Sequence, residues 1–198
     1  MTELTMVTMH TEPGLDRNPR SRRMLTETCL EDYLIRIGRS CPVTLGHTLT
    51  GQPFVVEGSP FLSTACCRSH WVCAVGNRPV GVDLERLRPI DVDNLARHVF
   101  APREQDLCRN SHREFFNIWT KKEAYSKMTG QGLLMPFLSF DTTQPNALGV
   151  EFYELPCATE YKAVLCRATA RDQSGRAGQS GTMFFHSLDN TSISLLLD

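Results

Sequence analysis

Residues 80–86 carry the sequence VGVDLER, in which apolar and polar side chains alternate. This alternation is typical of a β-strand with one buried face, so the three apolar side chains point one way, and Asp83 and Glu85 point the other way. Two such positions lie roughly 6.5 Å apart on one face, so the two carboxylates can converge on one cation. Many strands show the same pattern on a solvated face, so this stretch alone does not identify a metal site.

A helix is predicted from Ser111 to Gly130 and carries the sequence WTKKEAYSK at residues 119–127. Ser111 followed three residues later by glutamate is a capping-box pattern, and glycine after the last apolar residue is a typical helix end. On the helical wheel Glu123 falls on the apolar face of this helix. A buried carboxylate needs a partner, which is either an ion pair, with Lys127 one turn further on, or a bound cation.

The three acidic side chains form a set of oxygen ligands without histidine or cysteine. Such a set suits Mg²⁺, which keeps some of its waters when it binds phosphate groups, better than it suits zinc. Three carboxylates exceed the charge of the metal by one, and a pyrophosphate adds further negative charge, so basic side chains must surround the ligand. Each candidate could also be a solvated surface residue. The candidates are Arg23, Arg86, Lys121, Lys122 and Lys127.

The stretch from Gly81 to Glu85, followed by the stretch from Trp119 to Lys127, resembles the paired signatures of the 4'-phosphopantetheinyl transferase superfamily. These signatures are G-(I/V)-D-x-E and (F/W)-x-x-K-E-(A/S)-x-x-K, and the pair at this spacing is far more specific than either alone. The resemblance covers about residues 70–168 well. It implies an α+β fold of two halves related by a pseudo-twofold axis, with the active site in the cleft between them, as in the monomeric surfactin-synthetase type.

The same resemblance implies an enzyme that moves the 4'-phosphopantetheine group of coenzyme A to a serine of an acyl or peptidyl carrier protein and releases 3',5'-ADP. Asp83, Glu85 and Glu123 would then hold Mg²⁺ against the coenzyme A pyrophosphate. Glu123 would also accept the proton of the serine, and Lys127 would add positive charge as a catalytic group. Lys122 and Lys127 match the phosphate-binding lysines of the family.

The resemblance also assigns residues to the nucleotide side of the site. The segment from Gly51 to Pro53 is similar to a G-K-P segment beside the adenine, although residue 52 is glutamine here. Arg23 matches an arginine near the nucleotide phosphates.

The clearest departure from the family lies before the strand that contains Trp71. The family usually carries N-x-S-H-S there, and this chain has Cys66 and Cys67 at the serine and histidine positions. A cysteine cannot supply the cationic hydrogen bond of a histidine. Arg68 or His70 could substitute for it.

Two other functions would use the same carboxylates. One is a catalytically impaired carrier-protein or nucleotide-binding module with the same fold. The other is a metal-dependent hydrolase that cleaves coenzyme A with water as the nucleophile. The sequence does not name the carrier protein, but the apolar segment at residues 133–137 beside Lys121 and Lys122 is either a docking surface or a loop packed on the core.

The 198-residue chain has a formal net charge of -1, from 21 Lys plus Arg and 22 Asp plus Glu. This balance gives no global positive field of the kind that draws proteins to nucleic acid or anionic lipid. No apolar run approaches the roughly 20 residues that span a bilayer, and Glu3 stands where a secretory signal would carry cations. We therefore expect a cytoplasmic protein that binds neither nucleic acid nor membranes.

The cysteine spacing favours free thiols. Eight cysteines are present, no two of them have C-x-x-C spacing, and Cys66 and Cys67 are the only close pair. This spacing disfavours a zinc site or a disulfide framework, so we expect reduced cysteines that pack as small hydrophobic residues.

The remaining pattern predicts two related halves, residues 1–86, shortened and on the nucleotide side, and residues 87–198, which contain the helix with WTKKEAYSK. Further helices are expected at residues 21–38, 91–100 and 102–108. Strands are expected at residues 4–9 (on a sheet edge), 71–75, 80–85, 137–141, 150–154, 161–168, 183–186 and 193–197. Residues 76–79 should join two of these strands as a hairpin, residues 41–63 should be mostly loop, and residues 171–181 should form a polar glycine-rich loop.

Overall fold

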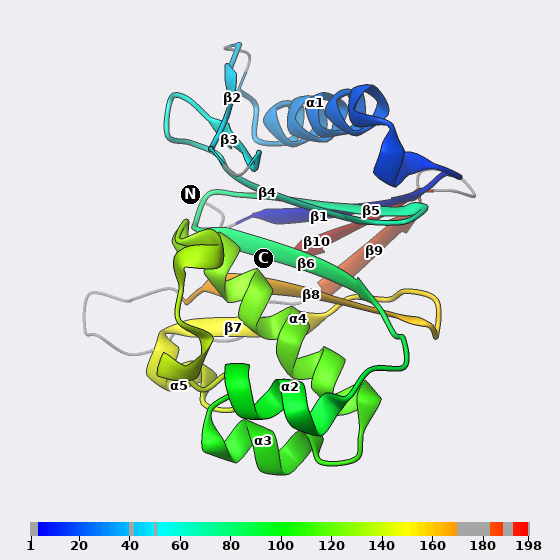
Figure 1. The fold of residues 1–198 in the computed structure, drawn as a ribbon. Helices are drawn as coiled ribbons and strands as arrows, with labels where there is room; N and C mark the ends of the chain where they lie inside the picture. The colour runs from blue at the N-terminus through cyan, green and yellow to red at the C-terminus, as the bar shows by residue number, and fades with distance from the viewer. Residues whose placement is uncertain (1–3, 40–41, 50, 170–182, 188–191, 198) are drawn as a thin grey trace.

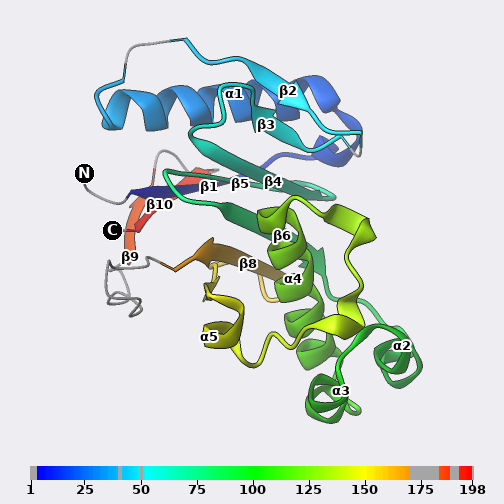
Figure 2. The same ribbon diagram turned by 90° about the vertical axis from the view of Figure 1, so that its left-hand side faces the viewer.

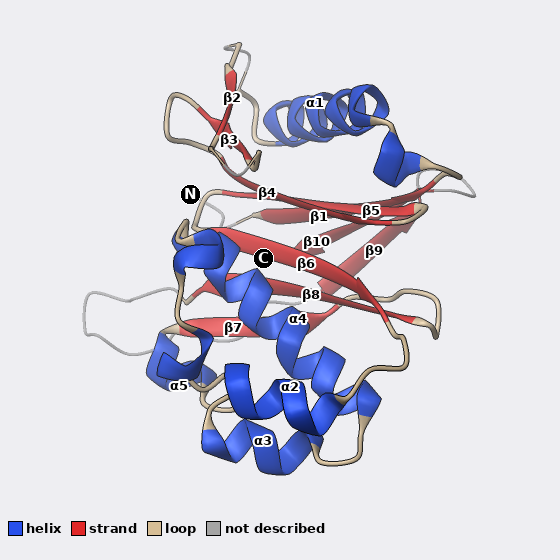
Figure 3. Ribbon diagram, viewed as in Figure 1, coloured by secondary structure: helices blue, strands red, loops and turns tan. Residues whose placement is uncertain are grey.

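Helices and sheets stack in layers in the computed structural model, which describes residues 4–39, 42–49, 51–169, 183–187 and 192–197. The layers are helix α1 (Pro19–Arg36), a five-stranded sheet, a three-stranded sheet and helix α4 (His112–Thr129) (Figure 1). Figure 3 shows the strands gathered between the outer helices, so the expected α+β fold class is confirmed. None of the described helices is both long and apolar enough to cross a membrane.

The five-stranded sheet joins strands from early and late in the chain. Its order is β4 (Phe61–Cys67), β5 (His70–Gly76), β1 (Thr5–Thr11), β10 (Ser192–Leu197) and β9 (Met183–Ser187). Strand β1 is central, because Val7 pairs with Ala74 on β5 and with Leu195 on β10. The edge position expected for residues 4–9 is therefore wrong.

The three-stranded sheet has the order β6 (Val80–Arg86), β8 (Tyr161–Ala168) and β7 (Val150–Glu154). Helix α4 lies directly on this sheet, and Gly81 of β6 marks the closest approach. A Cβ atom at Gly81 would lie 1.9 Å from the carbonyl oxygen of Ala124, so residue 81 has no room for a side chain. This close contact fixes the spacing between the polar face of β6 and the side chains of α4.

The main core fills the space between the two sheets. Val7 and Ala74 of the five-stranded sheet pack there against Val82, Leu84 and Leu165 of the three-stranded sheet. The predicted division of β6 into two faces is thus confirmed, because its apolar side chains enter this core and its polar side chains face α4. A second core lies between α1 and the five-stranded sheet.

The shorter elements lie around these layers. Helices α2 (Val92–Val99) and α3 (Pro102–Cys108) pack near one end of α4, and α5 (Pro145–Leu148) precedes β7 (Figure 2). Strands β2 (Leu45–His47) and β3 (Pro53–Val55) form a hairpin beside α1. Single 3₁₀ turns occur at Leu15–Arg17, Gly132–Leu134 and Phe137–Ser139.

The four predicted helices are present, and α4 has the predicted ends. Ser111 accepts the backbone N–H of Glu114 at 3.3 Å, and Gly130 ends the helix with a positive φ of 74°. A positive φ is accessible to glycine at little cost, which explains why the helix stops there.

The predicted hairpin between residues 71–75 and 80–85 is wrong. Strand β5 has β4 and β1 as its two neighbours, whereas β6 pairs with β8, so residues 76–79 carry the chain from one sheet to the other. Both hydrogen-bonding edges of β5 are already occupied, so β6 cannot add to it.

Two further expectations differ from the structure. Residues 61–63, at the end of the expected loop, begin strand β4, and residues 137–141, expected to be a strand, contain a 3₁₀ turn instead. The carbonyls of Phe137 and Phe140 accept from the side chain of Lys122 rather than from a neighbouring strand. Of the expected loop at residues 171–181, nothing lies within the described residues.

The strand pairing does not divide the chain at residue 86, where two halves were expected to meet. Strand β6 precedes that position but pairs with β8, and β10 follows it but pairs with β1. The relatedness of residues 1–86 and 87–198 stays a prediction.

Candidate active site

Asp83 and Lys127 join β6 to α4 at the centre of the candidate site. Lys127 Nζ donates to Asp83 Oδ1 at 2.8 Å and to the carbonyl oxygen of Val82 at 3.1 Å. Asp83 is only 6% exposed, and its second oxygen, Oδ2, is buried without a hydrogen-bond partner. A buried carboxylate oxygen without a partner is costly, so this atom is suited to a cation.

Glu85 lies two residues further along the same face of β6. Its Oε1 accepts from the indole Nε1 of Trp119 on α4 at 3.1 Å, and its Oε2 accepts from Arg88 at 3.2 Å. Burial raises the pKa of Glu85 above its ordinary value, and the nearby negative charge of Asp83 raises it further. The indole therefore fixes the orientation of a carboxylate whose ionised form is disfavoured by its surroundings.

Glu123 lies on α4 near Asp83, Glu85 and Lys127, whose charges act on it. Burial, followed by the negative charge of Asp83, raises the pKa of Glu123 to about 7, although Lys127 acts in the opposite direction. The sequence left open whether Lys127 would pair with Glu123, and in the structure its ion-pair partner is Asp83 instead.

The acidic groups repel one another, and this repulsion bears on the predicted metal. Within the described ranges, no group of three acidic, histidine or cysteine side chains stands close enough together to hold a metal ion. The donor set still fits a hard cation, because Asp83 Oδ2 lacks a partner and because burial, followed by negative neighbours, raises the pKa values of Glu85 and Glu123. A divalent cation would relieve both conditions.

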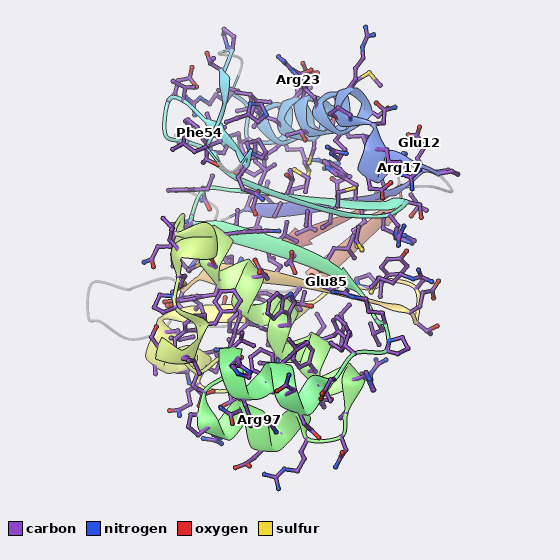
Figure 4. The ribbon with its side chains drawn as sticks, viewed as in Figure 1. Glu12, Arg17, Arg23, Phe54, Glu85 and Arg97 are labelled. Atoms are coloured by element: carbon purple, nitrogen blue, oxygen red, sulfur yellow. The ribbon has the colours of Figure 1, made fainter. Side chains whose placement is uncertain are left out.

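A pocket of about 570 Å³ opens beside this cluster and is lined by α1, the β2–β3 hairpin, β4, β6 and α4. Figure 4 shows Arg23 on α1, above the five-stranded sheet, and Glu85 on β6, below it. Of the residues predicted to form the site, the pocket brings together Arg23, Gly51, Pro53, Cys66, Cys67, Asp83, Glu85 and Lys127. Glu123 lies next to this group but does not line the pocket.

Cys66 and Cys67 end strand β4 and are half-buried at the pocket wall. Burial raises the pKa of both thiols above the ordinary value, so they remain neutral at pH 7. The suggested substitutes do not line the pocket. Arg68 is exposed in the β4–β5 turn. His70 Nδ1 lies 3.1 Å from Ser69 Oγ, and the centroid of the His70 ring lies 4.1 Å from that of Tyr161.

Lys122 lies on the other side of α4 from the pocket and is fully buried. Its Nζ pairs with Glu104 at 2.8 Å and donates to the carbonyls of Phe137 and Phe140, both at 2.7 Å. Glu104, also fully buried, accepts from the backbone and hydroxyl of Thr142. All three N–H groups of the ammonium are thus satisfied within the protein, and the structure does not bring Lys122 to the predicted phosphate site.

Comparison with known proteins agrees with this geometry. A family model described as the 4'-phosphopantetheinyl transferase superfamily matches residues 79–175, which include β6, α4 and β8. Residues 79–175 belong to this superfamily. Two parts of this matched stretch meet at the pocket. They are the strand with Asp83 and Glu85 and the helix with WTKKEAYSK.

Curated relatives carry the same name. The chain is 34% identical over 128 residues to 4'-phosphopantetheinyl transferase gsp of Aneurinibacillus migulanus, a match that covers 60% of this chain and 52% of the relative. It is 40% identical over 95 residues to the transferase HetI of Nostoc sp., covering 44% and 40%. It is 30% identical over 116 residues to the transferase Sfp of Bacillus subtilis, covering 50% and 51%. The chain thus spans about half the length of the relatives that it matches.

Arg22 at the candidate site and Glu104 as the partner of Lys122 were not predicted from the sequence. Arg22 lines the pocket beside Arg23, and its Nη1 donates to the carbonyls of Leu15 and Asp16. Its place next to Arg23 on α1 was a usable signal. No sequence pattern indicated that Glu104 would pair with Lys122, because Glu104 lies on a different helix.

Proposed function

We propose that this chain is a magnesium-dependent 4'-phosphopantetheinyl transferase. It transfers the 4'-phosphopantetheine group of coenzyme A to a serine of an acyl or peptidyl carrier protein and releases 3',5'-ADP. The observation that carries the proposal is the meeting of Asp83, Glu85 and Lys127 at one pocket whose far wall contains Arg23 and Gly51. The names of the relatives support it.

Asp83, Glu85 and Glu123 are the residues that would hold Mg²⁺. Their oxygen donors and the unpartnered Asp83 Oδ2 fit this ion. When bound, the metal supplies positive charge to the pyrophosphate of coenzyme A. Trp119 holds the Glu85 carboxylate through its indole N–H, so this ligand is oriented before substrate arrives.

Lys127 and Glu123 carry the chemistry that the chain itself provides. The serine oxygen attacks the pantetheine-side phosphorus, and the bond from that phosphorus to the bridging oxygen breaks, so that 3',5'-ADP leaves. Lys127, held at the pocket by Asp83 and Val82, stabilises the negative charge on the transferred group. Glu123 accepts the proton of the serine.

A carrier protein can approach beside α4. Leu134 and Leu138 are 91% and 53% exposed in the segment that follows this helix, and Lys121 lies on the preceding turns. Carrier proteins are acidic along their recognition helix, so an apolar strip next to a lysine suits them. We propose this strip as the docking surface of a monomeric enzyme that works in the cytoplasm.

Mass spectrometry of an apo carrier protein mixed with the chain, coenzyme A and Mg²⁺ tests the function. The proposed transferase attaches the phosphopantetheine arm to the carrier serine. An unchanged carrier and intact coenzyme A would indicate a binding module instead. Cleaved coenzyme A with an untouched carrier would indicate a hydrolase.

A further inference from the structure

The pocket that would hold coenzyme A has few cations for its phosphates. Among the described residues that line it, Arg22, Arg23 and Lys127 are cationic and Asp16, Asp83 and Glu85 are anionic, while His47 is counted as neutral at pH 7. The charges of the lining therefore cancel. Coenzyme A carries a pyrophosphate and a second phosphate, at the ribose 3' position, so two separate anionic groups would need positive partners in one electrically balanced pocket.

Two of these cations are already held by the protein. Lys127 pairs with Asp83 at 2.8 Å, next to the acidic cluster that suits the pyrophosphate. One terminal nitrogen of Arg22 donates to the carbonyls of Leu15 and Asp16 at 2.8 and 2.6 Å. These contacts fix both side chains, and a ribose phosphate would have to compete for them.

Arg23 is the remaining cation, and it is poorly placed for a strong contact. Its side chain is 66% exposed and pairs with Glu27 one turn along α1 at 2.8 Å. An exposed ion pair is screened by water and salt, so it changes an affinity only a few-fold. Turning Arg23 toward a phosphate would therefore add little.

The neutral polar groups on this wall do not replace a cation. His47 and Gln52 stand at the β2–β3 hairpin, where His47 is exposed to water and salt, and Cys66 and Cys67 end β4. A thiol is a weak hydrogen-bond donor, and burial keeps both thiols neutral and half-covered. An amide donates a hydrogen bond but brings no charge.

We propose that this site does not depend on the 3'-phosphate of its donor and takes 3'-dephospho-coenzyme A nearly as well as coenzyme A. The inference rests on the function proposed above. The bond that forms, from serine oxygen to phosphorus, and the bond that breaks are the same for both donors. The leaving group is 5'-AMP with the dephospho donor and 3',5'-ADP with coenzyme A.

The direct test compares kcat/KM for the two donors with one apo carrier protein. A ratio below about tenfold is expected, whereas charge-assisted hydrogen bonds to the 3'-phosphate would raise the ratio above tenfold. A higher ratio would overturn the inference and leave the proposed function standing. If neither donor reacts, the proposed function fails.

Binding of the two leaving groups provides a readout that needs no catalysis. Calorimetry should give dissociation constants for 3',5'-ADP and 5'-AMP that agree within about tenfold. Clearly tighter binding of 3',5'-ADP would show that the pocket recognises the 3'-phosphate, and the inference would then be wrong even for an inactive chain.

A gain-of-charge pair completes the test. Gln52→Lys adds a cation to the pocket wall and should tighten 3',5'-ADP several-fold while 5'-AMP changes little. Thr28→Lys adds the same charge on the exposed part of α1 outside the pocket lining and should change neither ligand. Equal tightening of both ligands by Gln52→Lys, or none, would contradict the inference that a missing cation on this wall makes the site indifferent to the 3'-phosphate.

Discussion

Lys127 Nζ and Asp83 Oδ1 lie 2.8 Å apart although 44 residues separate them in the chain. The contact exists because Gly81 lets α4 rest on β6, so that side chains on the helix meet carboxylates on the strand. The ion pair is 14% exposed on the lysine side and 9% on the aspartate side, so water screens it weakly. It connects the two sequence signatures in space.

Replacement of Asp83 by asparagine should abolish transfer without unfolding the protein. Asn keeps the shape and still accepts a hydrogen bond from Lys127, but it removes the charge proposed to bind Mg²⁺. We expect a loss of at least about a hundredfold in kcat/KM, with a small change in Tm. Asp106→Asn is the control, because Asp106 makes only an exposed ion pair with Arg109. Unchanged turnover of Asp83→Asn in saturating Mg²⁺ would remove the metal assignment.

Replacement of Lys127 by alanine should slow the chemical step more than it weakens coenzyme A binding. The lysine lies where negative charge develops on the transferred group, so we expect kcat to fall about a hundredfold and the Kd of coenzyme A to change only a few-fold. Single-turnover kinetics and calorimetry separate the two effects. A loss confined to Kd would make Lys127 a phosphate anchor only.

Lys122 and Glu104 should behave as a structural pair. Lys122→Met leaves a fully buried carboxylate without its cation, which should cost about 3–5 kcal/mol in the free energy of unfolding. The double variant Glu104→Gln with Lys122→Met should cost less than the sum of the two single variants. Urea unfolding measures all three. Full stability of Lys122→Met, with weaker coenzyme A binding, would restore the phosphate role predicted from the sequence.

Magnesium binding should release a proton from Glu123 below neutral pH. In the metal-free protein the pKa of this carboxyl is raised to about 7, so at pH 6 it is mostly protonated and the metal must displace that proton. Mg²⁺ affinity should therefore fall as the pH falls through 7, by up to about tenfold per pH unit. Since the unfolded carboxyl ionises at lower pH, the metal-free fold should also lose stability as the pH rises toward 7. Calorimetry at pH 6 in two buffers of different ionisation enthalpy measures the proton release, and its absence would contradict the assignment of Glu123.

Replacement of Cys67 by histidine should strengthen nucleotide binding. Cys67 lines the pocket, and a cationic ring there could donate a charge-assisted hydrogen bond that increases affinity roughly tenfold. Arg68→Ala should change binding little, because Arg68 does not line the pocket. Calorimetry on both variants decides the matter. A large loss from Arg68→Ala with no gain from the histidine would mean that the β4–β5 turn closes over the ligand.

Local signals explain what the sequence predicted well. The caps at Ser111 and Gly130 and the alternation in residues 80–86 act within a few residues, so α4 and β6 could be placed from the sequence. The pairing of β6 could not, because Val82 lies opposite Leu165, far along the chain, whereas the turn-like residues 76–79 suggested a nearby partner. Strand β4 was missed because its Ser, Thr and Cys residues give a weak strand pattern between prolines and glycines.

The candidate site divides in the same way. The acidic residues, Lys127 and the pocket-wall residues are brought together, because strand and helix geometry determines which side chains share a face. Lys122 is the informative exception. Its neighbour Glu123 faces the cluster, but one residue further back on the helix the side chain points to Glu104 of α3, and only the packing of α3 reveals that.

The position of β1 has a consequence for how the molecule is made. Val7 is among the first described residues to be synthesised, and its partner Leu195 is among the last. On the ribosome β1 can meet β5 early, but one of its edges stays open until β10 has emerged. During that interval the open edge of β1 is exposed to pairing with other nascent chains, which is a route to aggregation.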